Sequence, residues 1–287
     1  MANERSRLLG TFVDKVAVRS YVASLSSRVT LPRVYQVVGD ARDLDPSLWP
    51  EEVVIKPSHG SGALVIVSKE RREGLSYQIP NGDFRWDKGI WGMLTQDIDP
   101  GVLENLGRQW LKSGYEYWSP KYPEWAYRHV PRRIIVEELL VGTQAHPLVE
   151  ARFHCFQGIV RLARVTNVLS TERRAWTLDP EGLVLDAWLE TDPIKEVAPF
   201  AVPPMWSTAI REAGRLSRDI DYLRVDLYLT DTTVYFSELT PYPNGGNVDF
   251  LPEELSTWLA ALWNADVDHL AFDNFLSTKK KHSLDLT

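Results

Sequence analysis

Two neighbouring runs of residues near the carboxyl end of the chain place the strictest limits on its fold. In the run YLRVDLYL, residues 222–229, apolar side chains alternate with Arg224 and Asp226. Because successive side chains of a strand point to opposite faces, this run predicts a strand with one core face and one charged face. The core face comprises Leu223, Val225, Leu227 and Leu229.

The next run, TVYFSEL at residues 233–239, is rich in strand-forming residues and predicts the second strand of a hairpin. We expect three of its side chains on one face: Val234, Phe236 and Glu238. If the chain turns through Thr230–Thr232, Arg224 lies opposite Glu238, and Asp226 lies diagonal to it. The hairpin therefore gathers two carboxylates and a guanidinium on one surface.

Two interpretations fit this group of charges. Two converging carboxylates suit Mg²⁺, which binds a few carboxylate oxygens together with phosphates and water. The same residues also form ordinary ion pairs between an arginine and carboxylates on the solvated face of a sheet. The hairpin alone leaves both interpretations open.

A second pair of strands flanks a loop in the stretch VVIKPSHGSGALVIV, residues 53–67. Lys56 ends the first strand, and Gly60 and Gly62 lie in the loop. Glycines let backbone N–H groups approach an anion closely, and a lysine adds a compact positive charge, so the pattern suits phosphate. The spacing is not that of a Walker A loop. The alternative is a surface lysine before a hairpin turn.

The rest of the chain mixes helices and strands without a strict β–α–β period, which favours an α+β fold. Residues 70–100 have no clear period. Apolar spacing predicts helices over residues 14–29, 101–117, 206–220 and 252–264. Further strands are predicted within RRIIVEELLVG, residues 132–142, and within ARFHCFQGIVRLARV, residues 151–165, where Gln157 and Gly158 join two strands.

The strand that begins EARFHCF places Arg152 and His154 on one face, and Phe153 and Cys155 on the other. Cys155 is therefore expected in the core, and nothing in its surroundings marks it as a reactive thiol. His154 has no second histidine at metal-ligand spacing. We expect it to be either a structural residue or a substrate contact.

The composition excludes several classes of protein. The 287-residue chain has a net charge of −7 with basic and acidic residues well mixed, which predicts no nucleic-acid partner. No run approaches the ~20 apolar residues of a membrane span, and the first ten residues lack the core of a signal peptide. A single cysteine fits a reducing compartment, so we expect a cytoplasmic protein. The oligomeric state stays open, with a homo-oligomer among the options.

Taken together, these stretches resemble the ATP-grasp superfamily, and more closely the TupA-like ATP-grasp family, which is linked to peptide addition in cell-wall polymers. The resemblance spans residues 14 to about 253. It is carried by six stretches in order: DK at 14–15, VIKPSHGSGALVIV, PRRIIVEELL, ARFHCFQG, YLRVDLY and YFSELTPYPNGG. It implies an ATP-grasp fold, in which two α+β subdomains clasp ATP.

The resemblance also implies which residues meet the nucleotide. Lys15 and Lys56 look like the two lysines that reach the phosphates. The loop over the β- and γ-phosphates corresponds to His59, Gly60, Ser61 and Gly62. The hinge that meets the adenine edge corresponds to Glu137, Glu138, Leu139 and Leu140. The implied cofactors are ATP and Mg²⁺.

The same resemblance implies roles in catalysis. Arg152 looks like the basic residue aimed at the γ-phosphate, with Glu150 in place of the usual aspartate. Asp226 and Glu238 look like the Mg²⁺ ligands. Arg224 looks like the arginine that stabilises the acyl phosphate and the tetrahedral intermediate.

Two departures from the superfamily pattern stand out. Many ATP-grasp enzymes have an asparagine two positions after the final acid, whereas this chain has Thr240, so a second Mg²⁺ is in question unless Asn244 substitutes. Lys15 also lies almost at the amino terminus of the sequence, so the separate domain that precedes this lysine in many such ligases is essentially missing. The acceptor must then be held differently.

The resemblance suggests a division of the chain into four parts. Residues 1–45 form a helical segment that carries the first lysine, and 46–140 form the smaller subdomain with the glycine loop and hinge. Residues 141–275 form the larger subdomain with the metal site, and 276–287 form a polar tail.

The sequence ELTPYPNGG, residues 238–246, follows the strand of Glu238. Its prolines and glycines end the strand and turn a stiff loop past the expected γ-phosphate. Backbone N–H groups of Asn244, Gly245 and Gly246 are candidates to bind a carboxylate substrate, together with His154. The alternative is an exposed acid beside a turn that ends the strand.

These roles favour a carboxylate–amine ligase, which joins a small-molecule or peptide carboxylate to an amine through an acyl phosphate and releases ADP. Two alternatives stay open. One is a kinase of the same fold that phosphorylates a hydroxyl, with His154 or Asp249 as base. The other is a non-catalytic nucleotide-binding module.

Overall fold

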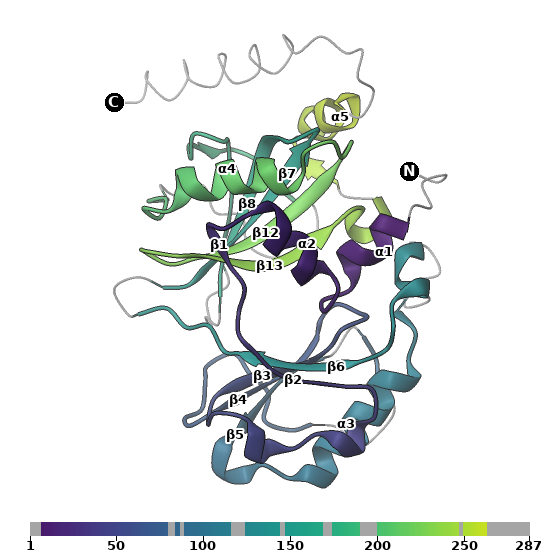
Figure 1. The fold of residues 1–287 in the computed structure, drawn as a ribbon. Helices are drawn as coiled ribbons and strands as arrows, with labels where there is room; N and C mark the ends of the chain where they lie inside the picture. Colours follow the sequence, from purple (N-terminus) through teal and green to yellow (C-terminus); the bar gives the residue numbers. More distant parts are fainter. Residues whose placement is uncertain are drawn as a thin grey trace.

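A computed structural model describes residues 7–79, 84–86, 89–115, 124–143, 147–168, 174–189, 200–246 and 249–262. In Figure 1 the chain forms two large sheets, one above the other, with helices beside each, and a small two-stranded sheet completes the described fold. The mixture of sheets and separate helices confirms the predicted α+β class. The expected polar tail, residues 276–287, and the last part of the helix predicted over 252–264 lie outside the described residues.

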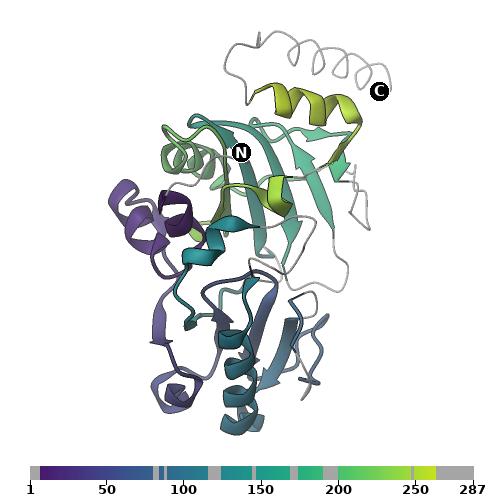
Figure 2. The same cartoon turned by 90° about the vertical axis from the view of Figure 1, so that its right-hand side faces the viewer.

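The lower sheet in Figure 1 has five strands in the order β2–β6–β3–β4–β5. Its pairs are antiparallel, except that β4 and β5 are parallel. The strands are β2 (Val34–Val38), β3 (Val53–Pro57), β4 (Ala63–Ser68), β5 (Gly89–Leu94) and β6 (Ile134–Glu138). Helix α3 (Pro100–Lys112) runs along this sheet (Figure 2) and buries Leu103, Leu106 and Trp110 in a shared core. Asp99 begins the helix by accepting hydrogen bonds from the N–H groups of Gly101 and Val102.

The upper sheet has seven strands in the order β1–β13–β12–β7–β8–β9–β10, and only the β1–β13 pair is parallel among the described residues. The strands are β1 (Val29–Thr30), β7 (Val149–Phe156), β8 (Ile159–Asn167), β9 (Ala175–Leu178), β10 (Val184–Leu185), β12 (Leu223–Leu229) and β13 (Val234–Thr240). Helix α4 (Trp206–Leu216) packs on the apolar face of this sheet. Helix α5 (Glu253–Ala261) and the small sheet of β11 (Trp188–Leu189) and β14 (Phe250–Leu251) cover another end.

The amino-terminal helices α1 (Arg7–Val13) and α2 (Val18–Leu25) belong spatially with the seven-stranded sheet (Figure 1). The Tyr21 hydroxyl donates to the carbonyl of Leu216, at 2.9 Å, and the Ser26 hydroxyl donates to Glu212, at 2.6 Å. The chain then passes through β1 into β2, which is already part of the five-stranded sheet. The predicted division of the chain at residues 45, 140 and 275 stays a prediction.

The predicted hairpin exists, but its expected register was wrong. Asp226 pairs directly with Glu238, and Arg224 pairs with Thr240. The cause is a β-bulge, because Leu227 pairs with Phe236 and Ser237 is the extra residue between the two pairs. The bulge changes which face the following side chains occupy.

As a result, the expected common face of Val234, Phe236 and Glu238 was also wrong. Val234 and Phe236 lie in the core, whereas Glu238 joins Asp226 on the opposite, polar face. The Gln157–Gly158 connection occurs as predicted, with φ of 50° and 80°, the left-handed conformation of a tight turn. Strand β5, inside the stretch without a clear period, was not predicted.

No helix in the described part of the chain is both long and apolar enough to cross a membrane.

Candidate active site between the two sheets

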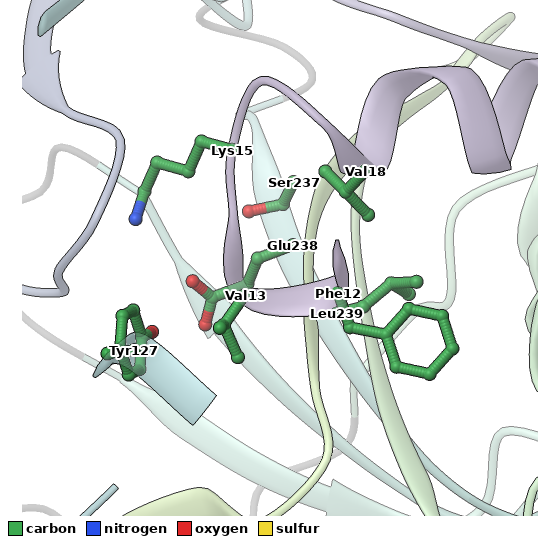
Figure 3. Close-up of a pocket in the computed structure, with 8 residues that line it drawn as sticks. All are labelled: Phe12, Val13, Lys15, Val18, Tyr127, Ser237, Glu238 and Leu239. Carbon is green, nitrogen blue, oxygen red and sulfur yellow. The ribbon is translucent and has the colours of Figure 1, made fainter. Parts of the chain in front are cut away.

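The two sheets turn polar faces toward a common region, and Lys15 lies between them. The Lys15 ammonium donates to the carbonyl oxygen of Gly60 in the glycine loop. Its pKa is lowered to about 8, mainly by burial, and the charges that act on it include Glu238 of the upper sheet and both Lys56 and Glu137 of the lower sheet. Figure 3 shows Lys15 and Glu238 lining one small pocket, together with Tyr127. The structure thus brings together residues from four distant parts of the sequence.

The upper half of the site is the group of charged residues on the seven-stranded sheet, and Arg224 is at its centre. Its Nε and Nη2 atoms donate to both oxygens of Asp226, at 2.6–3.1 Å, and Nη2 also lies 2.6 Å from Glu238 Oε1. The same Nη2 donates to the hydroxyl of Thr240, at 3.1 Å. A planar guanidinium is suited to such shared binding, because its N–H groups form a fixed fork. One arginine therefore joins both candidate metal ligands.

The neighbouring strand β7 adds a second arginine. Arg152 pairs across the sheet with Asp226, and its Nε lies 3.8 Å from Asp226 Oδ2. Its closer partner is Glu150, whose Oε2 accepts from Nη2 at 2.6 Å. Glu150 Oε1 in turn accepts from the hydroxyl of Ser237, the bulge residue, at 3.0 Å. Glu150, which stands where the superfamily pattern usually has aspartate, thus contacts both Arg152 and Ser237.

The two candidate metal ligands have opposite pKa shifts. Burial raises the pKa of Asp226 to about 7, despite the opposing effect of Arg224. Glu238 is also subject to burial, but Arg224, Lys15 and Arg152 together hold its pKa down to about 2. The two carboxylates, in turn, raise the pKa of Arg224 above its ordinary value although burial opposes this. Glu238 therefore carries the more firmly held negative charge.

The residues present fit a magnesium ion. Asp226 and Glu238 are direct cross-strand neighbours, so their carboxylate oxygens can converge on one ion. Thr240 adds a hydroxyl oxygen, which donates to Glu238 Oε1 at 3.2 Å. The donor set contains only oxygen atoms, as Mg²⁺ prefers, and no group of three or more acidic, histidine or cysteine ligands occurs among the residues that the structure describes. The remaining ligands of such an ion would have to come from phosphate and water.

The lower half of the site lies on the five-stranded sheet and is centred on one ion pair. Lys56 and Glu137 form an ion pair and are diagonal neighbours on adjacent strands, because Lys56 pairs with Ile135. They lie on the face of the sheet away from the core that α3 covers. Both side chains are only slightly exposed, 17% for Lys56 and 11% for Glu137. Lys56 is therefore not the exposed surface lysine of the alternative interpretation.

The glycine loop is packed rather than open. A Cβ atom at Gly60 would lie 2.3 Å from the indole ring of Trp86, and Gly62 has a φ of 74°. His59 is buried, contacts the Trp110 carbonyl at 3.0 Å, and has a pKa lowered by burial. Ser61 is half-buried. Sequence reasoning did not find Trp86, because nothing in its irregular neighbourhood indicated a contact with the loop.

The predicted hinge leads out of β6. Glu138 accepts from the N–H of Arg33 at 2.9 Å, and its own N–H donates to the Arg33 carbonyl at 2.8 Å. Leu139 and Leu140 follow and are half-buried. These contacts tie the hinge to the segment before β2. Binding of adenine there stays a prediction.

The proposed substrate residues fall into two environments. His154 is buried, its Nδ1 lies 2.9 Å from the Tyr222 hydroxyl, and burial followed by nearby arginines lowers its pKa to about 3. These contacts favour the structural alternative, and a substrate role stays a prediction. The loop after β13 is exposed at Asn244, Gly245 and Gly246, all with positive φ, and Tyr242 anchors it by accepting from the Ala126 N–H at 2.6 Å.

The arrangement of two facing sheets, with lysines on one side and carboxylates on the other, is that of an ATP-grasp protein. The family model of the TupA-like ATP-grasp family matches residues 1–264, and the chain belongs to this family. The predicted ATP-grasp fold is thereby confirmed. A comparison with curated protein sequences finds no significant match.

Solved structures of ligases are also similar to this chain, at low identity. A D-alanine–D-alanine ligase from Bacillus anthracis complexed with ATP is 12% identical, with a TM-score of 0.40 over 82% of this chain and 55% of that one. The ATP-grasp ligase PsnB, complexed with a phosphomimetic variant of minimal precursor, Mg and ADP, is 12% identical, with a TM-score of 0.44 over 90% and 61%. The D-alanine–D-alanine ligase from Helicobacter pylori is 13% identical, with a TM-score of 0.38 over 82% and 55%. This chain thus spans little more than half the length of those ligases.

Proposed function

We propose that this protein is an ATP-dependent carboxylate–amine ligase that forms an amide through an acyl phosphate and releases ADP and phosphate. Membership of the ATP-grasp family supports ATP as the nucleotide that the protein binds. The observation that carries the proposal is the cross-strand pair of Asp226 and Glu238, which Arg224 bridges. Glu238 of this pair lines one pocket together with Lys15. Positive groups for a triphosphate and oxygen ligands for its cation are thus within one site.

The residues of the chain would act mainly by positioning and by charge. Lys15, Lys56 and Arg152 would hold the phosphates of ATP, while Asp226 and Glu238 would hold Mg²⁺. The ion, when bound, supplies positive charge that offsets the charge of the γ-phosphate. A substrate carboxylate attacks the γ-phosphorus, the bond to the β-phosphate oxygen breaks, and ADP leaves.

The second half of the reaction needs an amine and a place for negative charge. The amine attacks the carbonyl carbon of the acyl phosphate, the bond between that carbon and the phosphate oxygen breaks, and phosphate leaves with its electron pair. The nitrogen gives up one proton, which the departing phosphate can accept. Arg224 is our candidate to stabilise the oxyanion, and the support for this role is that its guanidinium contacts both candidate metal ligands. The exposed N–H groups of the Asn244–Gly246 loop are our candidates for the substrate carboxylate. No covalent intermediate with a side chain is needed.

The kinase alternative is less well supported. It needs a general base near the γ-phosphate, and the low pKa of the buried His154 makes that imidazole a poor proton acceptor at neutral pH. Asp249, the other candidate, is exposed just before β14. The sole cysteine, Cys155, is buried with a pKa raised to about 12, so it is not a candidate nucleophile.

One incubation separates the alternatives. Purified protein is mixed with ATP, Mg²⁺ and mixed amino acids, and the products are read by mass spectrometry, with Glu238→Gln as the control. A ligase yields ADP and an amide, a kinase yields ADP and a phosphorylated acceptor, and a binding module yields neither. Formation of ADP with a phosphorylated product and no amide would overturn the proposed ligase.

A further inference from the structure

A closed ring of contacts joins the residue before Lys15 to the beginning of the glycine loop. The carboxylate of Asp14 accepts from Arg133 Nη2 at 2.6 Å. The carbonyl of Arg133 accepts from the N–H of Ser58 at 2.8 Å, and the carbonyl of Ser58 accepts from the N–H of Lys15 at 3.2 Å. Because Lys15 directly follows Asp14, the ring closes on itself.

The members of this ring are tightly held. Asp14 is only 3% exposed and Ser58 is fully buried. The other oxygen of Asp14 accepts from the N–H of Val16 at 2.9 Å, which shapes the turn between α1 and α2. The Ser58 hydroxyl donates to the Pro131 carbonyl at 3.1 Å and accepts from the Arg133 N–H at 3.2 Å, so this buried hydroxyl is satisfied as both donor and acceptor.

The ring connects the two halves of the molecule. Asp14 and Lys15 lie between α1 and α2, which pack beside the seven-stranded sheet. Ser58 directly follows β3, and Arg133 directly precedes β6, and both of these strands belong to the five-stranded sheet. Two residues beyond Ser58, the Gly60 carbonyl accepts from the Lys15 ammonium. The placement of Lys15 relative to the glycine loop therefore depends on this ring.

We propose that Asp14 and Arg133 are positioning residues that hold Lys15 and the glycine loop in the mutual arrangement a nucleotide triphosphate requires. The inference rests on the proposed function, because it takes Lys15 and the loop as the phosphate-binding groups. Neither residue needs to touch the nucleotide. Their ion pair sets in advance a geometry that binding would otherwise have to arrange at a cost in affinity. In a reaction, a misplacement of ~1 Å can lower the rate on the order of a hundred-fold.

The test compares ATP with adenosine, which lacks the phosphates. Asp14→Asn keeps the shape of the side chain and an oxygen for the Val16 N–H, but it removes the charge that holds Arg133. We expect calorimetry to show ATP affinity reduced about ten-fold or more, with adenosine affinity within about two-fold of the wild type. The same selective loss is expected for Arg133→Gln. The double variant should lose no more than the worse single variant, because both changes break one interaction.

Glu212→Gln is the matched control. Glu212 is also a buried carboxylate, 1% exposed, that binds a hydroxyl and an arginine, but its partners Ser26 and Arg215 both lie away from the glycine loop. This variant should leave the ratio of ATP affinity to adenosine affinity unchanged even if it lowers the unfolding temperature. If Asp14→Asn does not fold, Arg133→Gln carries the test, since Arg133 is more exposed, at 28%.

The outcomes are separable from those for the proposed function. Equal losses of ATP and adenosine affinity in Asp14→Asn and Arg133→Gln, or no loss in either variant, would overturn the positioning role while ligase activity of the wild type still stood. The same ratio change in Glu212→Gln would also overturn it, because the effect would then follow from general loosening. A wild-type protein that binds no ATP would overturn both proposals together.

Discussion

The two sheets contribute opposite kinds of charge to the site. On the side of the five-stranded sheet, Glu137 pairs with Lys56, and Lys15, from the turn between α1 and α2, adds a second ammonium near them. In the seven-stranded sheet, three carboxylates share two guanidiniums. With every group ionised, Lys15, Lys56 and Glu137 together have a net positive charge, and the three carboxylates with two guanidiniums have a net negative charge. The net positive charge suits phosphates, and the net negative charge suits a divalent cation.

The two halves also differ in how their charged groups are held. Lys56 and Glu137 form one diagonal pair near the ends of their strands. The upper-sheet charges instead form a network over strands β7, β12 and β13. It combines pairs two residues apart on one strand, such as Arg224 with Asp226, with cross-strand contacts, such as Arg224 with Glu238. This difference suggests that changes in the upper half alter turnover, whereas changes in the lower half alter nucleotide affinity. Four experiments test this assignment, in order of expected effect.

The largest effect is expected at the candidate metal ligands. Asp226→Asn and Glu238→Gln should each reduce ADP formation by on the order of a hundred-fold or more, because the lost carboxylate charge stabilises the cation that offsets charge on the phosphates. ADP release is measured at saturating Mg²⁺, and circular dichroism checks that the fold is retained. Near wild-type turnover in either variant would remove that residue from the metal site. Glu212→Gln serves as a buried carboxylate outside the site.

The next effect should appear in the lower half as a loss of affinity. Lys56→Ala removes a charge-assisted contact to phosphate, worth ~1.5–3 kcal/mol, so ATP affinity should fall roughly ten- to 150-fold. Lys69→Ala is the matched control, since Lys69, directly after β4, forms an exposed ion pair with Glu51. Calorimetry that finds the same ATP affinity for Lys56→Ala and wild type would contradict the assigned role.

Arg224→Lys separates two roles within the upper half. Lysine keeps the charge but loses the fork that holds both carboxylates, so we expect kcat to fall about ten-fold with little change in the KM for ATP. Arg224→Ala should be worse, because it also leaves the buried Asp226 without its main partner. An unchanged kcat with a shifted Mg²⁺ requirement would instead assign Arg224 a bracing role for Glu238.

The smallest effect concerns pH. Since the pKa of Lys15 is lowered to about 8, its amino group in the free protein is protonated and charged below pH 8. Above pH 8 it loses the proton and becomes neutral. Phosphate favours the charged form, so binding above pH 8 must take up a proton, and ATP affinity should decline by up to about ten-fold per pH unit. Lys15→Arg should abolish this decline, because arginine stays charged. A decline of equal slope in Lys15→Arg would show that another group is responsible.

Much of this molecule can be predicted from local sequence. Alternation in residues 222–229 correctly places Arg224 and Asp226 on a polar face, because side-chain direction in a strand repeats every two residues. The glycines between β3 and β4 mark the loop, since only glycine fits where Trp86 packs against Gly60. The family resemblance extends these local patterns to an ordered set of candidate residues along the chain.

The tertiary structure alone decides how these pieces meet. The bulge at Ser237 moves Glu238 opposite Asp226, and alternation cannot reveal an extra residue that interrupts it. The pairing of Asp14 with Arg133 joins residues 119 positions apart, and the contact of Trp86 with Gly60 joins two loops. Such contacts follow from the packing of whole sheets and helices around shared cores, and that packing depends on the entire chain rather than on any short stretch.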